Sequence, residues 1–217
     1  WVPETHVHRL THTSEMQPEG DSVLGRRVLQ YNNDVEIGIC IPEREADYFY
    51  RDGEGDEVIF VHEGSGVVET VFGVVPYRSG DYVVLPRATD HRWVPGEPSR
   101  LYAIEANSHI HPPKRYLSRF GQMLEHAPYC ERDLHGPAET FEAHGTDVEV
   151  LVKHRTSAGI VGTRMTYATH PFDVVGWDGC LYPYTFNIED YMPITGKVHQ
   201  PPPVHQVFEG WNFVICN

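Results

Sequence analysis

Cationic side chains and long apolar runs are both scarce in this sequence. Its 217 residues include 17 Lys and Arg against 31 Asp and Glu, a formal net charge of −14. Such a charge repels phosphate backbones and anionic lipid surfaces, which argues against nucleic acid or a membrane as the main partner. No apolar run approaches the roughly 20 residues that span a bilayer, and no export signal opens the chain. We therefore expect a cytoplasmic protein whose partner is a small molecule or another protein.

Several chemical motifs are also missing. The four cysteines, Cys40, Cys130, Cys180 and Cys216, are scattered and form no Cys-x-x-Cys pair, so we expect reduced thiols. The sequence has no Gly-x-Ser-x-Gly, no Walker loop and no Gly-x-Gly-x-x-Gly that opens a helix. Hydrolase and nucleotide-binding functions therefore have little support.

Short β-branched and aromatic runs recur between Gly, Pro and Asp clusters, a pattern typical of all-β sandwiches and barrels. We expect a cupin-like double-stranded β-helix, or jelly-roll barrel, with loop-rich extensions. One helix of about two turns is expected over residues 116–124. The expected strands are Val35–Ile41, Glu57–His62, Gly66–Val75, Asp81–Leu85, Leu101–Ala106, Val148–Val152 and Ile160–Tyr167.

We expect two regions along the chain. Residues 1–140 are predicted to form an N-terminal barrel, and residues 141–217 a loop- and strand-rich connecting segment. The chain ends on the apolar run Phe213–Asn217, which predicts a strand with an unpaired edge. We therefore expect further polypeptide after Asn217.

Arg51, Glu57 and His91 have the spacing of a metal site in such a barrel, with five residues between the first two. A non-haem Fe(II) centre takes two imidazoles and one carboxylate. Arg51 stands where the first imidazole is needed, and a guanidinium cannot donate a lone pair. We predict that Arg51 instead pairs with Glu57, that His91 hydrogen-bonds to either, and that no metal binds. A working metal site of Glu57, His91 and a neighbouring His, with isomerase-like chemistry, is the alternative.

Further histidines occur in two settings. The pairs His6/His8 and His109/His111 place both imidazoles on one face of a strand, but neither has the downstream Glu of a cupin metal site, so we expect surface or loop hydrogen bonding. Three prolines at 201–203 favour a rigid extended segment between His199 and His205. Imidazoles held in this way suit proton transfer near neutral pH, although a stiff crossing segment has the same pattern.

Several longer stretches, in order, resemble the bacterial type of homogentisate 1,2-dioxygenase, in its N-terminal portion. These stretches are Gly80–Arg87, Ile104–Ile110, Pro113–Gln122, Glu125–Arg132 and Pro171–Cys180. Together with the segment from His199 to Glu209, they cover most of the chain after residue 50.

The resemblance implies an enzyme with two cupin-like barrels that uses Fe(II) and dioxygen to open the ring of homogentisate to maleylacetoacetate, in tyrosine and phenylalanine catabolism. It implies that the N-terminal barrel is inactive and that the iron ligands lie beyond Asn217. It gives His199 the role of catalytic acid or base and makes His205 a weaker, substrate-binding candidate. It also implies trimers that pair into hexamers. A non-catalytic cupin that acts as a scaffold, or binds a small acid through Arg51, is the alternative function.

Overall fold

The structure is a computed structural model that describes residues 7–172, 181–194 and 204–217. Its regular elements are strands and short 3-10 helices, without an α-helix in these ranges. The described segments therefore contain no helix that could cross a membrane. The 3-10 helices are Thr13–Glu15, Lys114–Tyr116, Glu131–Asp133 and Ile188–Asp190.

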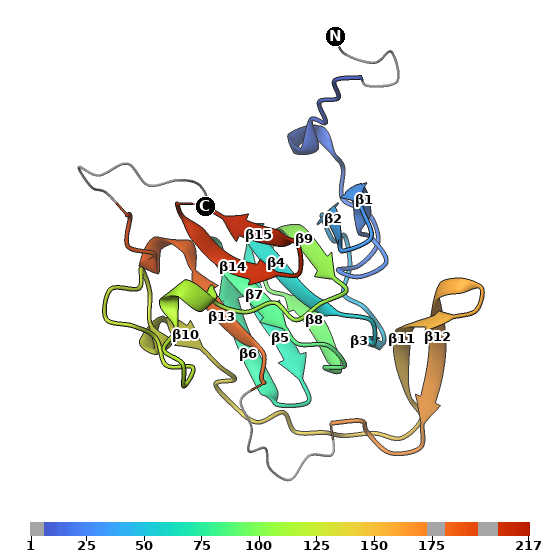
Figure 1. Cartoon of the computed structure of the whole chain (residues 1–217). Helices are drawn as coiled ribbons and strands as arrows, with labels where there is room; N and C mark the ends of the chain where they lie inside the picture. Colours follow the sequence, from blue (N-terminus) through green and yellow to red (C-terminus); the bar gives the residue numbers. More distant parts are fainter. Residues whose placement is uncertain (1–6, 173–180, 195–203) are drawn as a thin grey trace.

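The strands form two large sheets and one hairpin (Figure 1). In spatial order, the seven-stranded sheet consists of β1 (Arg27–Tyr31), β2 (Val35–Cys40), β9 (Arg100–Ala106), β4 (Asp56–Glu63), β7 (Asp81–Leu85), β13 (Tyr184–Asn187) and β10 (Leu134–His135). The six-stranded sheet consists of β12 (Gly159–Tyr167), β11 (Val148–Thr156), β3 (Phe49–Asp52), β8 (His91–Pro95), β5 (Ser65–Thr70) and β6 (Gly73–Arg78). The hairpin is β14 (Gln206–Gly210) with β15 (Phe213–Cys216).

From β2 to β9 the chain passes repeatedly between the two sheets, apart from the β5–β6 hairpin within the second. Strands β2, β4, β7 and β9 lie in the first sheet, and β3, β5, β6 and β8 lie in the second. The local orders β2-β9-β4-β7 and β3-β8-β5-β6, antiparallel throughout, are those of a jelly roll. The predicted all-β, cupin-like fold class is therefore confirmed, with sheets that remain open at their edges.

The seven-stranded sheet packs against an apolar layer on each of its two faces, so its central strands are buried on both sides. One face packs against the six-stranded sheet through residues such as Ile59, Val83 and Trp93. The other face packs through Val58 and Val84 against the β14–β15 hairpin and the loops around it. All five residues of β7 are buried for this reason. Strand alternation thus places odd-numbered residues of β4 and β9 inside the barrel and even-numbered ones under the hairpin.

Strands after residue 140 join both sheets. Strand β11 pairs in parallel with β3, and β13 pairs antiparallel with β7. Strand β12 pairs only with β11 among the described strands and forms the outer edge of its sheet. The expected division of the chain near residue 140 stays a prediction.

The expected helix over residues 116–124 is wrong. The structure has a 3-10 turn at Lys114–Tyr116, followed by a loop in which Leu117 and Met123 form an isolated bridge. Two local features oppose a helix here. Gly121 has a φ of 87°, and the Ser118 hydroxyl takes up the backbone N–H groups of residues 120 and 122. Side-chain bonds of this kind replace the helical ones.

Candidate functional site

The orientation of β3 determines which of its side chains face the interior of the barrel. Tyr50 stands opposite His91 in the pairing of β3 with β8, and their rings meet edge to face with centroids 5.4 Å apart. Because side chains alternate along a strand, Tyr50 and Asp52 face inward and Arg51 faces outward. The Arg51 guanidinium binds the Asp90 carboxylate through Nε at 2.7 Å and Nη2 at 2.5 Å. The predicted ion pair between Arg51 and Glu57 is therefore wrong.

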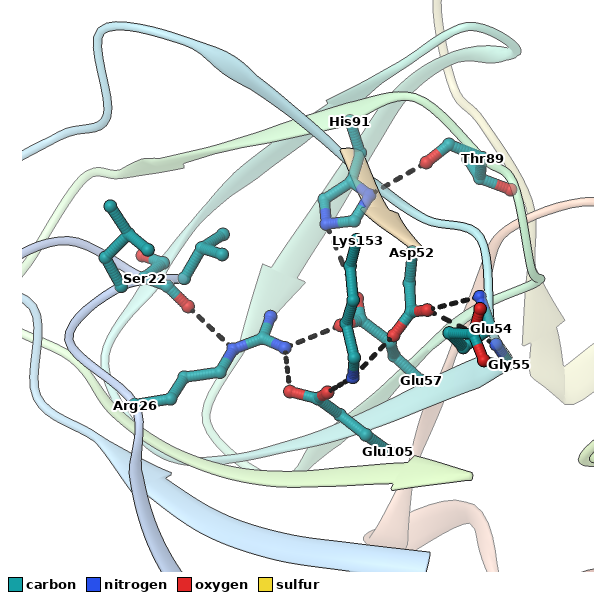
Figure 2. A network of polar contacts seen from close by, with 12 residues as sticks. Ser22, Arg26, Asp52, Glu54, Gly55, Glu57, Thr89, His91, Glu105 and Lys153 are labelled. Atoms are coloured by element: carbon teal, nitrogen blue, oxygen red, sulfur yellow. Dashed lines mark hydrogen bonds and ion pairs between the residues drawn. The ribbon is translucent and has the colours of Figure 1, made fainter. Parts of the chain in front are cut away.

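Arg26, just before β1, provides the cation that Glu57 needs. Its Nη1 donates to Glu57 Oε1 at 2.5 Å and to Glu105 Oε1 at 2.6 Å, and its Nε donates to the Ser22 carbonyl at 3.0 Å (Figure 2). The side chain is 8% exposed and Glu57 is 1% exposed. Burial by itself would lower the pKa of Arg26, but the two carboxylates hold it above its ordinary value. The guanidinium therefore stays charged inside the barrel.

Lys153 of β11 provides a second cation, which shares Glu105 with Arg26. Its Nζ donates to Asp52 Oδ2 at 3.1 Å and also to Glu105 Oε2 (Figure 2). Burial favours the neutral amine, but Glu105 and Asp52 outweigh it and raise the pKa of Lys153. Glu105 is consequently bonded to both protein cations.

His91 lies at the inner end of this network. Its Nδ1 donates to the Thr89 carbonyl at 3.0 Å, which leaves Nε2 with its lone pair. Nε2 lies 3.5 Å from Glu57 Oε2, yet no hydrogen bond joins the two atoms, and neither has another partner. The expected approach of His91 to Glu57 is confirmed, but the expected hydrogen bond is absent. Burial lowers the pKa of His91 to about 4, so the ring is neutral near pH 7.

The pKa values of the three carboxylates of the network are shifted in different directions. Asp52, Glu57 and Glu105 each offer an oxygen within 4.8 Å of the others. Burial raises the pKa of Asp52 to about 6 and also raises that of Glu57. Burial opposes ionisation of Glu105 too, but Arg26 and Lys153 together lower its pKa to about 2. The pKa of Glu105 is lowered, unlike those of Asp52 and Glu57, because Glu105 contacts both cations.

This donor set does not fit an Fe(II) centre of the two-histidine, one-carboxylate kind. The described network offers one imidazole, His91, and three carboxylates. Two of those carboxylates already bind Lys153, and two bind Arg26. A guanidinium and an ammonium group of the chain itself therefore neutralise the carboxylates of this network.

The histidine pair His109/His111 hydrogen-bonds within the protein, as expected. The two rings are 5.4 Å apart. His109 Nδ1 lies 2.7 Å from Asp56 Oδ2, and this hydrogen bond raises the pKa of His109. His111 Nδ1 lies 2.8 Å from the Pro112 carbonyl. His6, of the other pair, lies outside the described residues.

The two candidates for proton transfer and substrate binding are placed differently. His199, the predicted catalytic residue, lies outside the described residues. His205 is half-buried, and its Nε2 accepts the backbone N–H of Ile194 at 3.3 Å while its ring meets Tyr191 edge to face at 5.9 Å. With Nε2 as an acceptor, the neutral ring of His205 carries its proton on Nδ1. The roles of both histidines stay predictions.

Fold and site together define the class of this protein. It contains a cupin-like jelly-roll barrel in which the chain's own cations occupy the inner polar site. The family is then given by sequence: the model of the family described as homogentisate 1,2-dioxygenase N-terminal matches residues 29–188, most of the chain. The chain belongs to this family.

Curated relatives are dioxygenases by name. A provisionally named dioxygenase of Saccharolobus solfataricus is 35% identical over 100% of this chain and 55% of its own length. The homogentisate 1,2-dioxygenases of Bradyrhizobium diazoefficiens and Emericella nidulans are 26% and 25% identical, over 77% and 75% of this chain and 36% and 35% of their own lengths. The chain thus spans about half or less of the length of these relatives. The family suggests a metal cofactor.

Solved structures overlap parts of the chain. A cupin-2 domain protein from Shewanella frigidimarina covers 38% of this chain and 80% of its own, with 23% identity and a TM-score of 0.35. A protein from Neisseria meningitidis covers 46% of this chain and 99% of its own, with 19% identity and a TM-score of 0.39.

Proposed function

We propose that this chain is the N-terminal portion of an Fe(II)-dependent dioxygenase that opens the ring of homogentisate with O2 to give maleylacetoacetate. The match of residues 29–188 to the family of that name carries the proposal, and the 35% identical dioxygenase relative supports it. The proposed setting is cytoplasmic catabolism of tyrosine and phenylalanine. A homo-oligomer, a trimer or a pair of trimers, is part of the same proposal.

The barrel described above is proposed to contribute structure rather than iron ligands. Its inner carboxylates are bound to Arg26 and Lys153, and His91 is the one imidazole that the described network offers. The iron ligands are proposed to lie in the part of the relatives' length that this chain does not span. Iron, when bound there, would activate dioxygen and hold the substrate.

His199 is proposed as the acid or base that exchanges a proton with a substrate hydroxyl. A histidine with a pKa near neutrality suits this step, because deprotonation raises the electron density of the ring that dioxygen attacks. His205 is proposed to contact the substrate through its Nδ1–H, since Nε2 is already an acceptor for Ile194. A small-acid site at Arg51, the alternative function, is disfavoured because that guanidinium chelates Asp90.

The test is oxygen consumption with homogentisate by the product of the complete reading frame, compared with the 217-residue chain. We expect turnover only in the complete product. His199→Ala in that product should lower turnover by about 10²-fold or more with iron content unchanged, as for a lost general acid or base. Loss of iron in the variant would instead make His199 a ligand, and a complete product that contains iron but leaves homogentisate intact would refute the proposed substrate.

A further inference from the structure

The ammonium group of Lys153 sits among atoms that are themselves suited to bind a metal ion. Asp52 and Glu105 bind its Nζ directly, and Glu57 offers a third oxygen within 4.8 Å of theirs. Glu57 Oε2 and His91 Nε2 are fully buried, lack hydrogen-bond partners and lie 3.5 Å apart (Figure 2). Two ligand atoms bound at about 2.0–2.2 Å to one ion stand about 3.0–3.5 Å apart, so the Glu57–His91 pair needs little adjustment. His91 lies outside the group of three carboxylates whose oxygens are within 4.8 Å of one another, so it would have to move toward Asp52 and Glu105 to share their ion.

The charges of the network explain why no divalent ion is expected beside Lys153. When ionised, the three carboxylates Asp52, Glu57 and Glu105 face two cations, Arg26 and Lys153, which leaves one negative charge. A divalent ion would turn this into a net positive charge inside the barrel. Without Lys153 the same groups carry two negative charges, which one divalent ion neutralises.

The charged groups around the network add no net positive charge that would oppose metal binding. Arg51 is paired with Asp90, and Glu54 with Arg155 at 3.0 Å. Glu36 adds a further carboxyl group near Glu105. The surroundings are thus neutral or negative.

An access route to the cluster exists on the Lys153 side. An open pocket of about 340 Å³ is lined by Glu36, Asp52, Glu105 and Lys153, with Tyr31 and Ile160 among its other residues. Lys153 is 24% exposed, whereas His91 and Glu57 lie deeper, at 1% each. An ion that entered from this pocket would reach the place of the ammonium first.

We propose that the ammonium group of Lys153 substitutes for a divalent metal ion in this barrel, and that Asp52, Glu57, Glu105 and His91 form a latent metal site that opens when that ammonium is removed. The ligand class is a divalent transition metal that accepts carboxylate oxygens and one imidazole nitrogen, such as Mn²⁺ or Co²⁺. Arg26 stays in place and neutralises the third carboxylate. The inference concerns metal binding by this barrel and is independent of any turnover.

The test is titration with Co²⁺ of four purified forms of the chain: wild type, Lys153→Met, Lys153→Met with His91→Ala, and Lys114→Met. Calorimetry measures affinity, and visible absorption reports the ligand field. Methionine keeps the length of the side chain without its charge, and Lys114 is an exposed lysine in the 3-10 turn Lys114–Tyr116. We expect Lys153→Met to bind one Co²⁺ at least about 100-fold tighter than wild type and Lys114→Met. Removing His91 as well should weaken binding at least about tenfold and change the absorption bands.

Two results would overturn the proposal: a folded Lys153→Met chain that binds no tighter than wild type, or tight binding that is indifferent to His91. If Lys153→Met is unfolded without metal, Co²⁺ should restore its β-sheet circular dichroism, because metal binding then drives folding. Failure of Co²⁺ to do so would also count against the latent site.

Discussion

Two adjacent arginines have opposite environments. Arg26 is inside the barrel, bound to Glu57 and Glu105, while Arg27 pairs with Glu19 at the surface, at 2.6 Å with side chains 35% and 69% exposed. A buried charge that loses its partner is costly, whereas an exposed ion pair contributes little. The inner network should therefore depend on Arg26 and tolerate changes at Arg27.

Replacing Arg26 by Met is expected to destabilise the fold by about 3–5 kcal/mol, because Glu57 would be left buried without its cation. Arg27→Met should cost about 0–1 kcal/mol. Urea denaturation of both variants measures the difference. Equal, small losses would show that the Arg26 network does not hold the barrel together.

His109 gives stability a dependence on pH. Its hydrogen bond to Asp56 raises its pKa in the folded state above the unfolded value of about 6.5. A histidine whose pKa is raised in the folded state stabilises the fold fully at pH values below its pKa in the unfolded state. This stabilisation is lost as the pH rises through its pKa in the folded state. The melting temperature of the wild-type protein should therefore decrease above about pH 6.5, and the melting temperature of His109→Gln should lack this decrease.

The control for this prediction is His8→Gln, an exposed position near the N-terminus. Melting curves between pH 5.5 and 8.5 should place the control with wild type and separate His109→Gln from both. A variant curve parallel to wild type across this range would remove His109 as the cause.

Among the elements, strands were predictable where their own sequence carries the pattern. The run Asp81–Leu85 was predicted as a strand and coincides with β7, and Val35–Ile41 differs from β2 by one residue. Gly66–Val75 was expected as one strand but is divided by a turn between β5 and β6. Alternating burial also explains the error at Arg51. The motif spacing favoured Arg51 as the partner of Glu57, but side chains alternate along a strand, so Tyr50 and Asp52 face inward instead.

The inner cations could not be predicted from a motif. Arg26 is 31 residues from Glu57 and 79 from Glu105, and Lys153 is 48 residues from Glu105. Their meeting depends on the pairing of β11 with β3 and on the entry of the chain before β1, neither of which has a local signature. Glu57 and His91, on the strands of the barrel itself, were the part of the site that spacing could indicate.

The turn between β3 and β4 fixes the position of Asp52 against the inner network. At Gly55 an added Cβ would lie 1.4 Å from the Ala106 carbonyl oxygen, so a larger residue must push β9 away. Gly55→Ala should cost about 3 kcal/mol or more, as severe overpacking does. At Gly136 an added Cβ would meet Tyr182 at an ordinary 3.5 Å, so Gly136→Ala should change stability by less than about 1 kcal/mol. Thermal denaturation compares the two; a tolerated Gly55→Ala would mean that β9 is not held against this turn.

For the molecule as a whole, the fold and the family were predictable and the inner site was only partly so. The jelly-roll order follows from many strands, so errors at single strands, such as the missed β3 and β8, do not change it. The site depends on a few side chains, and one wrong assignment at Arg51 alters its chemistry. Arg26 and Lys153 supply the positive charge that Arg51 was expected to supply, and the absence of iron from this barrel stays a prediction.

The most direct test of this account is an anaerobic titration of the wild-type 217-residue chain with Fe(II), followed by measurement of the iron retained after gel filtration. The account predicts no stoichiometric iron, both in the wild type and in Glu57→Gln, because the chain's own cations occupy the inner site. One equivalent of iron retained by the wild type and lost in Glu57→Gln would contradict it.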